Sequence, residues 1–473
     1  MDTITTVYLP VGVGTYHMET AADQFARSVS LLKALDGQII VPGAPLLSVD
    51  AVRDFLAPLK PDLVIFQNIT FANGAYMAEL LRRYEGPVVL WTLREPAADG
   101  GRLKLNSLTG AYSAAHTLRN FGDRRFSYVF GAPEEENVRE AILAAVRAAK
   151  AQAAAVPTEE ASREMTPEEA LAASLKEKMR SLKMAAVGHT PQGFGFGRAL
   201  DAELMHVFGV ELESIELREL IGKAKDYTDT ECEEYLAKTE AATCGLSAMP
   251  EKNRRDHARL YKAYEDFVRS HGIGALASRC WPDTFTDYGT PVCTVLSLLN
   301  DEGIPAACEA DLYGALSMWI GVQLSGGPVF FGDPVALNEE ENTLTFWHCG
   351  MAACNLARKD TGAKVGVHPN RKIGPVMDFG CESFEDATIF RIGREPDGTF
   401  RFFIVEGKAL DKPKQYCGTS IVVRTDTNVR TLVESSVKDG FEPHFVIMKG
   451  RHGEVLKALA DMYGFPCFAP VNS

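Results

Sequence analysis

Short apolar runs alternate with helical stretches, and this alternation limits the possible folds more than any other feature of the chain. The runs "TVYLPVGV", "DLVIFQN" and "PVVLWTL" in the first hundred residues are rich in Val, Ile and Leu. Such runs are typical of buried parallel strands. The stretches "METAADQFARSVSLLKAL" and "GAYMAELLRRY" have helical character and lie between them. The sequence therefore predicts βαβ units in this region.

The same pattern restarts after an intervening segment. The alanine-rich "EENVREAILAAVRAAKAQAAAV" predicts a helix, and the Pro, Ser, Thr and Glu around 157–168 indicate a linker or an exposed helical connection. "TPEEA" offers a capping threonine followed by proline at the first helical position. "KMAAVGHTPQGFGFGRALDAELMHVFGVELESIEL" then predicts strand, glycine-rich turn, helix and strand. We expect "GIGALASRCWP" and "GIPAACEAD" to be later strands, with "PVCTVLSLLNDEG" as the helix between them.

After about residue 325 the pattern becomes antiparallel β. "PVFFGDPVALNEEENTLTFWHCG", "ATIFRIGREPDGTFRFFIVEGKAL" and "TSIVVRT" are short β-type runs, "EPDGTF" predicts a hairpin, and "GEVLKALADMYG" predicts a closing helix. A chain of 473 residues is expected to hold two or three domains. We expect an α/β fold with two consecutive doubly wound (Rossmann-like) domains, 1–160 and 161–325, followed by a β-rich sandwich or barrel domain, 326–473.

Composition argues against several classes of protein. The formal net charge is −14, from 49 basic and 63 acidic residues, which disfavours binding to nucleic acid or to an anionic membrane surface. No apolar run approaches the ~20 residues of a membrane span, and the start of the chain lacks the pattern of a signal peptide. The ten cysteines include no CxxC pair, which is typical of reduced thiols. We therefore expect a cytoplasmic protein.

The glycine-rich "GHTPQGFGFG" (188–197) lies where a phosphate-binding loop would lie, between a predicted strand and a helix. It matches neither GxGxxG nor GxxxxGK[ST]. This disfavours a nucleotide-dependent enzyme. Two interpretations remain, a strand–helix turn that needs glycine for backbone room, which we favour, and a contact with a sugar.

Four residues give a more specific prediction, that of a metal site. Glu309, in the apolar "IPAACEADLYGAL", and Asp333, in "GGPVFFGD", are carboxylates expected at the ends of buried strands. His348 follows an apolar run, and His444 opens "HFVIM". Mixed oxygen and nitrogen ligands favour Mn²⁺ over structural Zn²⁺, and a metal would neutralise the buried acids. Each residue alone is more often a capping or core residue, so the prediction depends on the four meeting.

The chain resembles the L-fucose and L-arabinose isomerases, a family of metal-dependent aldose–ketose isomerases, over most of its length. The best match runs from about 184 to 355, through "GFGFGRALDAELMHVFGVELESIEL", "CWPDTFTDYGTPVCTVLSLLNDEGIPAACEADLYGAL" and "GGPVFFGD". The resemblance implies metal ligation by Glu309, Asp333 and His444, with His348 as the extra histidine of the arabinose isomerase branch. It also implies Mn²⁺, a homohexamer, and an active site between the second and third domains, covered by a neighbour's first domain.

Such an isomerase moves a proton between C1 and C2 of a free sugar through a metal-bound enediolate. Glu309 and Asp333 would be both ligands and the acid–base pair. Asp311 lies two residues after Glu309, and on one continuous strand the two side chains would share a face. We expect Asp311 either to position the acid–base pair or to have a structural role. The substrate would be a pentose, a 6-deoxyhexose or a C6-modified hexose.

Further candidates would contact the sugar. Trp281 in "SRCWP" and Trp91 in "VVLWTLREP" fit a substrate wall, although core packing is at least as good an explanation for each. The weaker first-domain candidates are Arg94, Tyr16, His17 and His116.

A charged C6 group would require a nearby cation, for which the candidates are Arg94, Arg102, Arg279 and Lys104. The alternative to an isomerase is a non-catalytic sugar-binding or regulatory protein that uses the cleft between two α/β domains. The buried acids favour the isomerase, since a binder of a neutral sugar has no need to arrange them around a metal.

Overall fold

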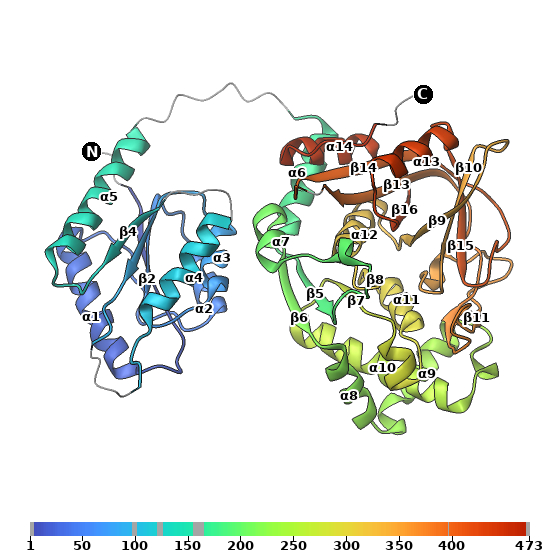
Figure 1. Ribbon diagram of the computed structural model, residues 1–473, viewed down its shortest axis with the longest axis horizontal. Coiled ribbons are helices and arrows are strands. Elements are labelled where there is room, and N and C mark those ends of the chain that lie inside the picture. Colours follow the sequence, from blue (N-terminus) through green and yellow to red (C-terminus); the bar gives the residue numbers. More distant parts are fainter. Residues whose placement is uncertain (1–3, 97–101, 121–125, 155–164, 396, 470–473) are drawn as a thin grey trace. The chain divides into compact units, whose positions relative to one another are not determined.

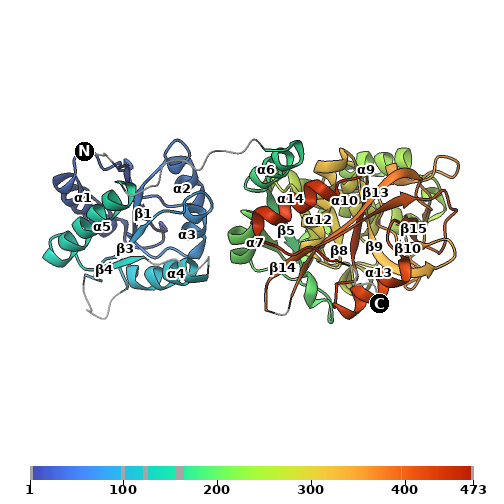
Figure 2. The ribbon, with the colours of Figure 1, turned by 90° about the horizontal axis from the view of Figure 1, so that it is seen from above.

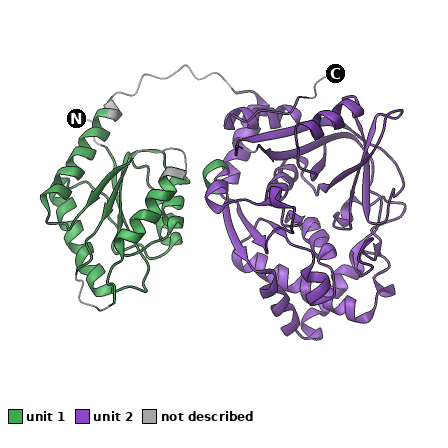
Figure 3. Cartoon of the chain, viewed as in Figure 1, with its two compact units in different colours: residues 1–163, 205–207 green, residues 164–204, 208–473 purple. Residues whose placement is uncertain are grey.

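The computed structural model describes residues 4–96, 102–120, 126–154, 165–395 and 397–469. The chain forms two compact units, of which unit 1 comprises residues 1–163 and 205–207 and unit 2 comprises residues 164–204 and 208–473 (Figure 3). The domain boundary predicted at residue 160 falls outside the described residues. The boundary predicted at 325 stays a prediction, because both sides of it belong to unit 2.

Unit 1 is built on a parallel sheet with the order β1-β2-β3-β4. The strands are β1 (Thr6–Val11), β2 (Leu63–Asn68), β3 (Val88–Thr92) and β4 (Ser127–Phe130). The helices are α1 (Met18–Leu35), α2 (Val49–Leu56), α3 (Gly74–Leu81), α4 (Ser107–Asn120) and α5 (Glu136–Ala154).

The first three strands of unit 1 are buried along their whole length, as expected of parallel strands covered on both faces. Ile40 and Leu46 pair in parallel with β1, on the edge that β2 leaves free. The strand order therefore reverses beside β1, as in doubly wound sheets. The three apolar runs predicted as strands are confirmed.

The second parallel sheet, in unit 2, has the order β6-β5-β7-β8. Its strands are β5 (Lys183–Val187), β6 (Glu211–Ile215), β7 (Ala275–Ser278) and β8 (Ala306–Cys308). The order reverses between β5 and β7, and sheets of this kind bind ligands beyond the carboxyl ends of the strands at such a reversal. The segments that follow β5, β7 and β8 are therefore the places to look for a site.

The later helices begin with α6, whose start has the predicted capping threonine, Thr166, in a capping box. They are α6 (Pro167–Met179), α7 (Asp201–Phe208), α8 (Leu217–Asp226), α9 (Asp229–Ala242), α10 (Glu251–His271), α11 (Cys293–Asp301), α12 (Leu312–Ser325), α13 (Val429–Lys438) and α14 (Gly453–Tyr463). Short helical turns lie at Gly195–Gly197, Leu246–Ala248, Thr284–Tyr288 and Cys354–Leu356. Helices α8, α9 and α10 gather at one end of unit 2 (Figure 1). Every described helix is too short or too polar to span a membrane.

The C-terminal part of unit 2 is a closed antiparallel barrel with the order β10-β15-β14-β13-β16-β9. Its strands are β9 (Phe330–Asn338), β10 (Thr343–His348), β13 (Phe384–Arg394), β14 (Phe400–Ala409), β15 (Thr419–Thr425) and β16 (Phe445–Lys449). The predicted hairpin is confirmed between β13 and β14, and the predicted closing helix, α14, lies along β14 (Figure 2). Strands β11 (Val365–Gly366) and β12 (Val376–Met377) form a separate pair.

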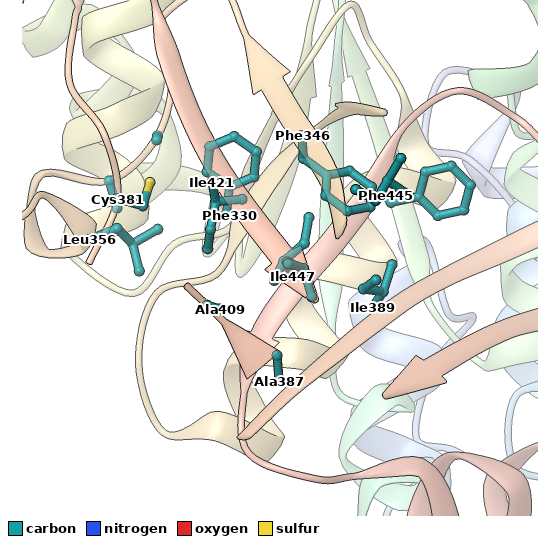
Figure 4. Packing of buried hydrophobic residues seen from close by; sticks show 14 of the residues in the cluster. Phe330, Phe346, Leu356, Cys381, Ala387, Ile389, Ala409, Ile421, Phe445 and Ile447 are labelled. Carbon is teal, nitrogen blue, oxygen red and sulfur yellow. The ribbon is translucent and has the colours of Figure 1, made fainter. Parts of the chain in front are cut away.

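Apolar side chains from several barrel strands fill the interior (Figure 4). Labelled members from β9, β10, β13, β15 and β16 are Phe330, Phe346, Ile389, Ile421, Phe445 and Ile447. Helix α12 is apolar on all sides and packs against β7 and β8 of the parallel sheet as well as β13 and β16 of the barrel. It therefore fixes the carboxyl end of β8 against the start of β16.

Candidate active site

The four residues predicted to form a metal site lie together in unit 2. Glu309 follows β8, His348 ends β10 and His444 directly precedes β16. Asp333 lies within β9 and not at its end as predicted, because the strand continues to Asn338 after its buried apolar part. Donor atoms of Glu309, His348 and His444 lie within 4.8 Å of one another. Asp333 Oδ1 lies 3.6 Å from His444 Nε2. Elements far apart in the sequence thus bring Glu309 and the two imidazoles together, with Asp333 next to His444.

Glu309 does not belong to a strand, although it was predicted to end one. Strand β8 ends at Cys308, and Glu309 and Ala310 have φ values of 59° and 54°, in the left-handed region that non-glycine residues rarely adopt. Each such residue costs about 1–3 kcal/mol, and such residues cluster at functional sites. The turn is held because the Ala310 N–H donates to the carbonyl of Ser278 at 3.0 Å. Because of this turn, Asp311 does not share one face of a strand with Glu309.

The buried charge of Asp311 is compensated by partners that could not be identified from the sequence alone. It caps α12, where Oδ1 accepts the N–H of Gly314 at 2.8 Å. The fully buried Arg391 donates to both of its oxygens, at 2.8 and 3.3 Å, and His444 Nδ1 lies 2.9 Å from Oδ2. Burial disfavours the charged carboxylate, but the Arg391 charge and the hydrogen bond from His444 hold the pKa of Asp311 well below its usual range.

Asp311 in turn orients His444. Because Asp311 is an ionised acceptor, His444 Nδ1 donates to it and Nε2 faces the other carboxylates, 3.0 Å from Glu309 Oε2. Burial lowers the pKa of the imidazole, but its hydrogen bonds to Asp311 and Glu309 outweigh this and raise it to about 9. A carboxylate that fixes the far nitrogen of a histidine is the arrangement found around metal-ligating histidines.

His348 supplies a buried donor atom with no protein partner. Its Nδ1 accepts the N–H of Cys349 at 2.9 Å, whereas Nε2 has no hydrogen-bond partner among the described residues although it is buried. Buried polar atoms are almost always satisfied, so one left open among Glu309 and His444 is what a ligand position requires. The oxygen and nitrogen donors fit a divalent ion of the Mn²⁺ type.

The two acids differ in their electrostatic surroundings. Burial raises the pKa of Glu309, but the hydrogen bond from His444 and the charges of the imidazoles reverse this, so the net shift is downward. For Asp333 burial is the stronger effect and the pKa is raised. Neighbouring carboxyl groups whose pKa values are driven apart are typical of acid–base pairs.

Aromatic rings surround this group. Trp281, which follows β7 and is half-buried, donates its indole N–H to Glu309 Oε1 at 2.9 Å. The ring of Phe194 lies 5.9 Å from Trp281 and 6.2 Å from His444, and that of Phe196 lies 5.5 Å from His444. Trp281 thus lies beside Glu309, and its role as a wall for the substrate stays a prediction.

The glycine-rich loop therefore brings two aromatic side chains next to His444, and its contact with a sugar stays a prediction. Its glycines also have a packing role. A Cβ atom at Gly197 would lie 2.8 Å from the Cα of Asp311, so the loop approaches Asp311 as closely as its backbone allows. The signal for Phe194 and Phe196 was the "GFGFG" spacing, which places two aromatic residues in a loop where a turn alone needs none.

The first-domain candidates lie in unit 1, and one of them has another role. Trp91 is fully buried in the core of unit 1, and its indole N–H donates to the carbonyl of Gly131 at 3.0 Å. It is therefore a core residue with no surface for a sugar, which corrects its expected place in a substrate wall. Arg94 is exposed and donates to both oxygens of Glu135, at 2.6 and 2.9 Å.

His17 caps α1, where its Nδ1 accepts the N–H of Thr20 at 3.3 Å, and His116 is an exposed residue of α4. The Tyr16 hydroxyl accepts a hydrogen bond from the side-chain amide of Asn106 at 2.9 Å. Their contact with a sugar stays a prediction.

A second group that sequence reasoning did not single out lies close by. Donor atoms of Cys293, Cys349 and His368 are within 4.8 Å of one another. All ten cysteines are free. Hydrogen bonds from the Cys308 S–H to neighbouring thiols, together with burial, raise the pKa of Cys308, so this thiol stays protonated and unreactive, as expected of a small buried residue.

The chain belongs to the fucose isomerase family and is an aldose–ketose isomerase. Residues 378–469 match the family described as L-fucose isomerase, C-terminal domain.

The chain is 58% identical over 455 residues to the sulfoquinovose isomerase of Clostridium sp. (strain MSTE9), covering 96% of each chain. It is 35% identical over 466 residues, 98% of each chain, to the sulfoquinovose isomerase of Priestia aryabhattai. To that of Alkalicoccus urumqiensis it is 34% identical over 467 residues, 97% of each chain. These relatives confirm the predicted family and the expectation of an enzyme.

A solved structure of an ABC transporter solute binding protein from Agrobacterium vitis, bound with alpha-D-tagatopyranose, also matches. Its TM-score is 0.16 and its identity 16%, with 69% of this chain and 91% of that chain covered. This likeness carries no weight for fold or function.

Proposed function

We propose that the chain is a divalent-metal-dependent isomerase of sulfoquinovose, the 6-deoxyglucose that carries a sulfonate on C6. The observation that carries the proposal is the meeting of Glu309, His348 and His444 in a chain that closely resembles sulfoquinovose isomerases. The reaction would move the carbonyl between C1 and C2 and leave the sulfonate untouched.

The ion would be held by Glu309, His348 and His444, with Asp333 beside them, and Mn²⁺ suits this donor set. A divalent cation there would polarise the sugar carbonyl and stabilise the negative charge of the enediolate.

Proton transfer is assigned to the two carboxyl groups. Glu309, whose pKa is lowered, is ionised at neutral pH and would remove the proton from C2. Asp333, whose pKa is raised by burial, would act as its partner acid. Trp281 holds Glu309 in place through its indole N–H, so that the carboxylate is directed before the substrate arrives.

The remaining residues hold the reacting groups in position and shield them from water. Asp311 fixes the tautomer and direction of His444, and Arg391 keeps Asp311 charged. Phe194 and Phe196 cover His444 with apolar surface and would limit access of water to the enediolate.

Two further parts of the proposal follow from family resemblance. They are assembly as a homohexamer and completion of the active site by the first domain of a neighbouring subunit. A location in the cytoplasm is a third part, which was inferred from the cysteine pattern. Free thiols at all ten cysteines support a reducing compartment.

The test is isomerisation of sulfoquinovose followed by NMR, with the enzyme as purified, after treatment with a chelator, and after addition of Mn²⁺. We expect ketose to form, to cease after chelation and to return with Mn²⁺. Ketose formation that is indifferent to chelation would remove the metal from the mechanism, and no turnover with bound Mn²⁺ would contradict the proposed substrate.

A further inference from the structure

A basic side chain lies over the aromatic wall of the site. The guanidinium carbon of Arg371 is 5.6 Å from the ring centre of Trp281 and 5.8 Å from that of Phe285. The edge of the same Trp281 ring donates its N–H to Glu309. The indole ring of Trp281 therefore has the Glu309 carboxylate at its N–H edge and the Arg371 guanidinium over its face.

The turn that carries Arg371 is anchored to a buried side chain. Nδ1 of the buried His368 accepts the backbone N–H groups of Asn370 and Arg371, at 3.2 and 3.3 Å. The backbone of His368 also pairs with Lys372 and Ile373, at 2.9 Å each. The ring of His368 packs edge-on against Phe285, with ring centres 5.1 Å apart. The position of Arg371 is thus set by the fold, although its side chain is exposed.

Two other cations of unit 2 are already neutralised by acidic side chains. Arg279, predicted as a contact for a charged C6 group, forms an ion pair with Asp283 at 2.5 Å. Arg391 is buried against Asp311. Among the described residues, by contrast, no acidic side chain forms an ion pair with Arg371.

Arg198 lines a cavity of about 600 Å³ beyond the ends of β5 and β6. The carboxylates of Glu216 and Glu219 line the same cavity, which disfavours an anion there.

We propose that Arg371 is the sulfonate-binding residue of the active site and the main source of its preference for a C6-sulfonated sugar. This inference rests on the proposed function. A sugar that lies along the Trp281 ring with its C1–C2 end at Glu309 extends its far end, C6, toward Arg371. The planar fork of N–H donors suits an oxyanion, and the aromatic rings of Trp281 and Phe285 favour a position of the guanidinium over their faces.

The preference for a sulfonated sugar arises because Arg371 attracts the sulfonate, and not because the site excludes neutral sugars. An exposed guanidinium without an anion remains solvated, so a neutral 6-deoxyhexose loses the contact but meets no buried, unsatisfied charge. Hydrogen bonds to charged groups contribute enough to expect a difference of about 10- to 100-fold between the two kinds of sugar.

The experiment compares wild type and Arg371→Gln on sulfoquinovose and on quinovose, its neutral 6-deoxy counterpart. We expect kcat/KM for sulfoquinovose to fall about 10- to 100-fold, mainly through KM, while that for quinovose stays within about twofold. Lys359→Gln, which removes one positive charge from a side chain that is 92% exposed, should change neither value. Equal losses on both sugars, or no loss on sulfoquinovose, would overturn the proposal.

Calorimetric binding of the sulfonated alditol, which cannot be isomerised, separates this inference from the proposed function. If the wild type turns over neither sugar but binds the alditol, and Arg371→Gln weakens that binding at least about tenfold, the sulfonate site stands and the isomerase assignment fails. If the wild type does not bind the alditol, or binds it no better than the variant does, the sulfonate site is refuted.

Discussion

The buried ion pair between Asp311 and Arg391 gives the sharpest prediction about how the site is held. Replacing Asp311 with Asn keeps the volume and an oxygen for the N–H of Gly314, but it leaves Arg391 without its charged partner. Removing one member of a buried ion pair costs about 3–5 kcal/mol. Glu442, with Oε2 3.6 Å from Arg391 Nε, offsets part of this, so we expect unfolding to become easier by about 2–4 kcal/mol.

The variant should also bind metal less well. Asn has no charge with which to favour a proton on Nδ1 of His444, so Nε2 is no longer kept free as a ligand. Loss of such a partner typically costs about 10- to 100-fold in metal affinity.

The assay is unfolding in urea, followed by circular dichroism, for wild type, Asp311→Asn and Asp360→Asn. The control removes the ion pair between Asp360 and Arg358, which is also joined by two hydrogen bonds. In this pair, however, the Asp360 side chain is 60% exposed. Exposed pairs contribute about 0–1 kcal/mol, so Asp360→Asn should lose no more than that. Equal stability losses in the two variants would refute the claim that burial makes the Asp311 pair important.

Three further predictions concern other parts of the molecule. Glu309→Gln should reduce turnover by at least about a thousandfold while leaving the circular dichroism spectrum unchanged, because it removes the charge and keeps the volume; normal activity would refute its role as base. Gly197→Ala should lower the free energy of unfolding by about 1–3 kcal/mol, because its Cβ meets the backbone of Asp311, whereas Gly195→Ala, with no atom within 4 Å of the added Cβ, should not; equal effects in urea titrations would contradict the packing argument. Burial lowers the pKa of His257 to about 3, so the unfolded state takes up the proton first as the pH falls below the ordinary histidine value, and stability is lost. Between pH 7 and pH 5 this group should account for about 2 kcal/mol of lost stability, which His257→Gln should abolish; identical pH profiles for wild type and variant would contradict it.

Much of the fold was predictable because local patterns report burial. The runs that became β1, β2 and β3 are apolar on both faces, and parallel strands covered on both faces require that composition. The hairpin between β13 and β14 was predictable from its turn residues alone. Helices α9 and α10 escaped notice because charged residues dominate their sequences and only a narrow apolar stripe packs inward.

The site was predictable in its residues but not in its geometry. Glu309, Asp333, His348 and His444 are chemically conspicuous in apolar surroundings, so residue type alone pointed to them. The partner of Asp311 was not predictable, because Arg391 lies eighty positions further along the chain and reaches Asp311 only through the packing of α12 against the barrel. Trp91 failed as a candidate because a tryptophan at a strand end fits a core as well as a substrate wall.

The central claim is that Glu309, His348 and His444 form one metal centre, and a calorimetric titration with Mn²⁺ tests it most directly. Wild type, Glu309→Gln and His444→Gln would be compared after chelator treatment, with Lys359→Gln as a control remote from the site. We predict one Mn²⁺ per chain in wild type and the control, and binding weakened by at least about a hundredfold in both site variants. Unchanged Mn²⁺ affinity in those variants would contradict the account, since the ion would then bind elsewhere.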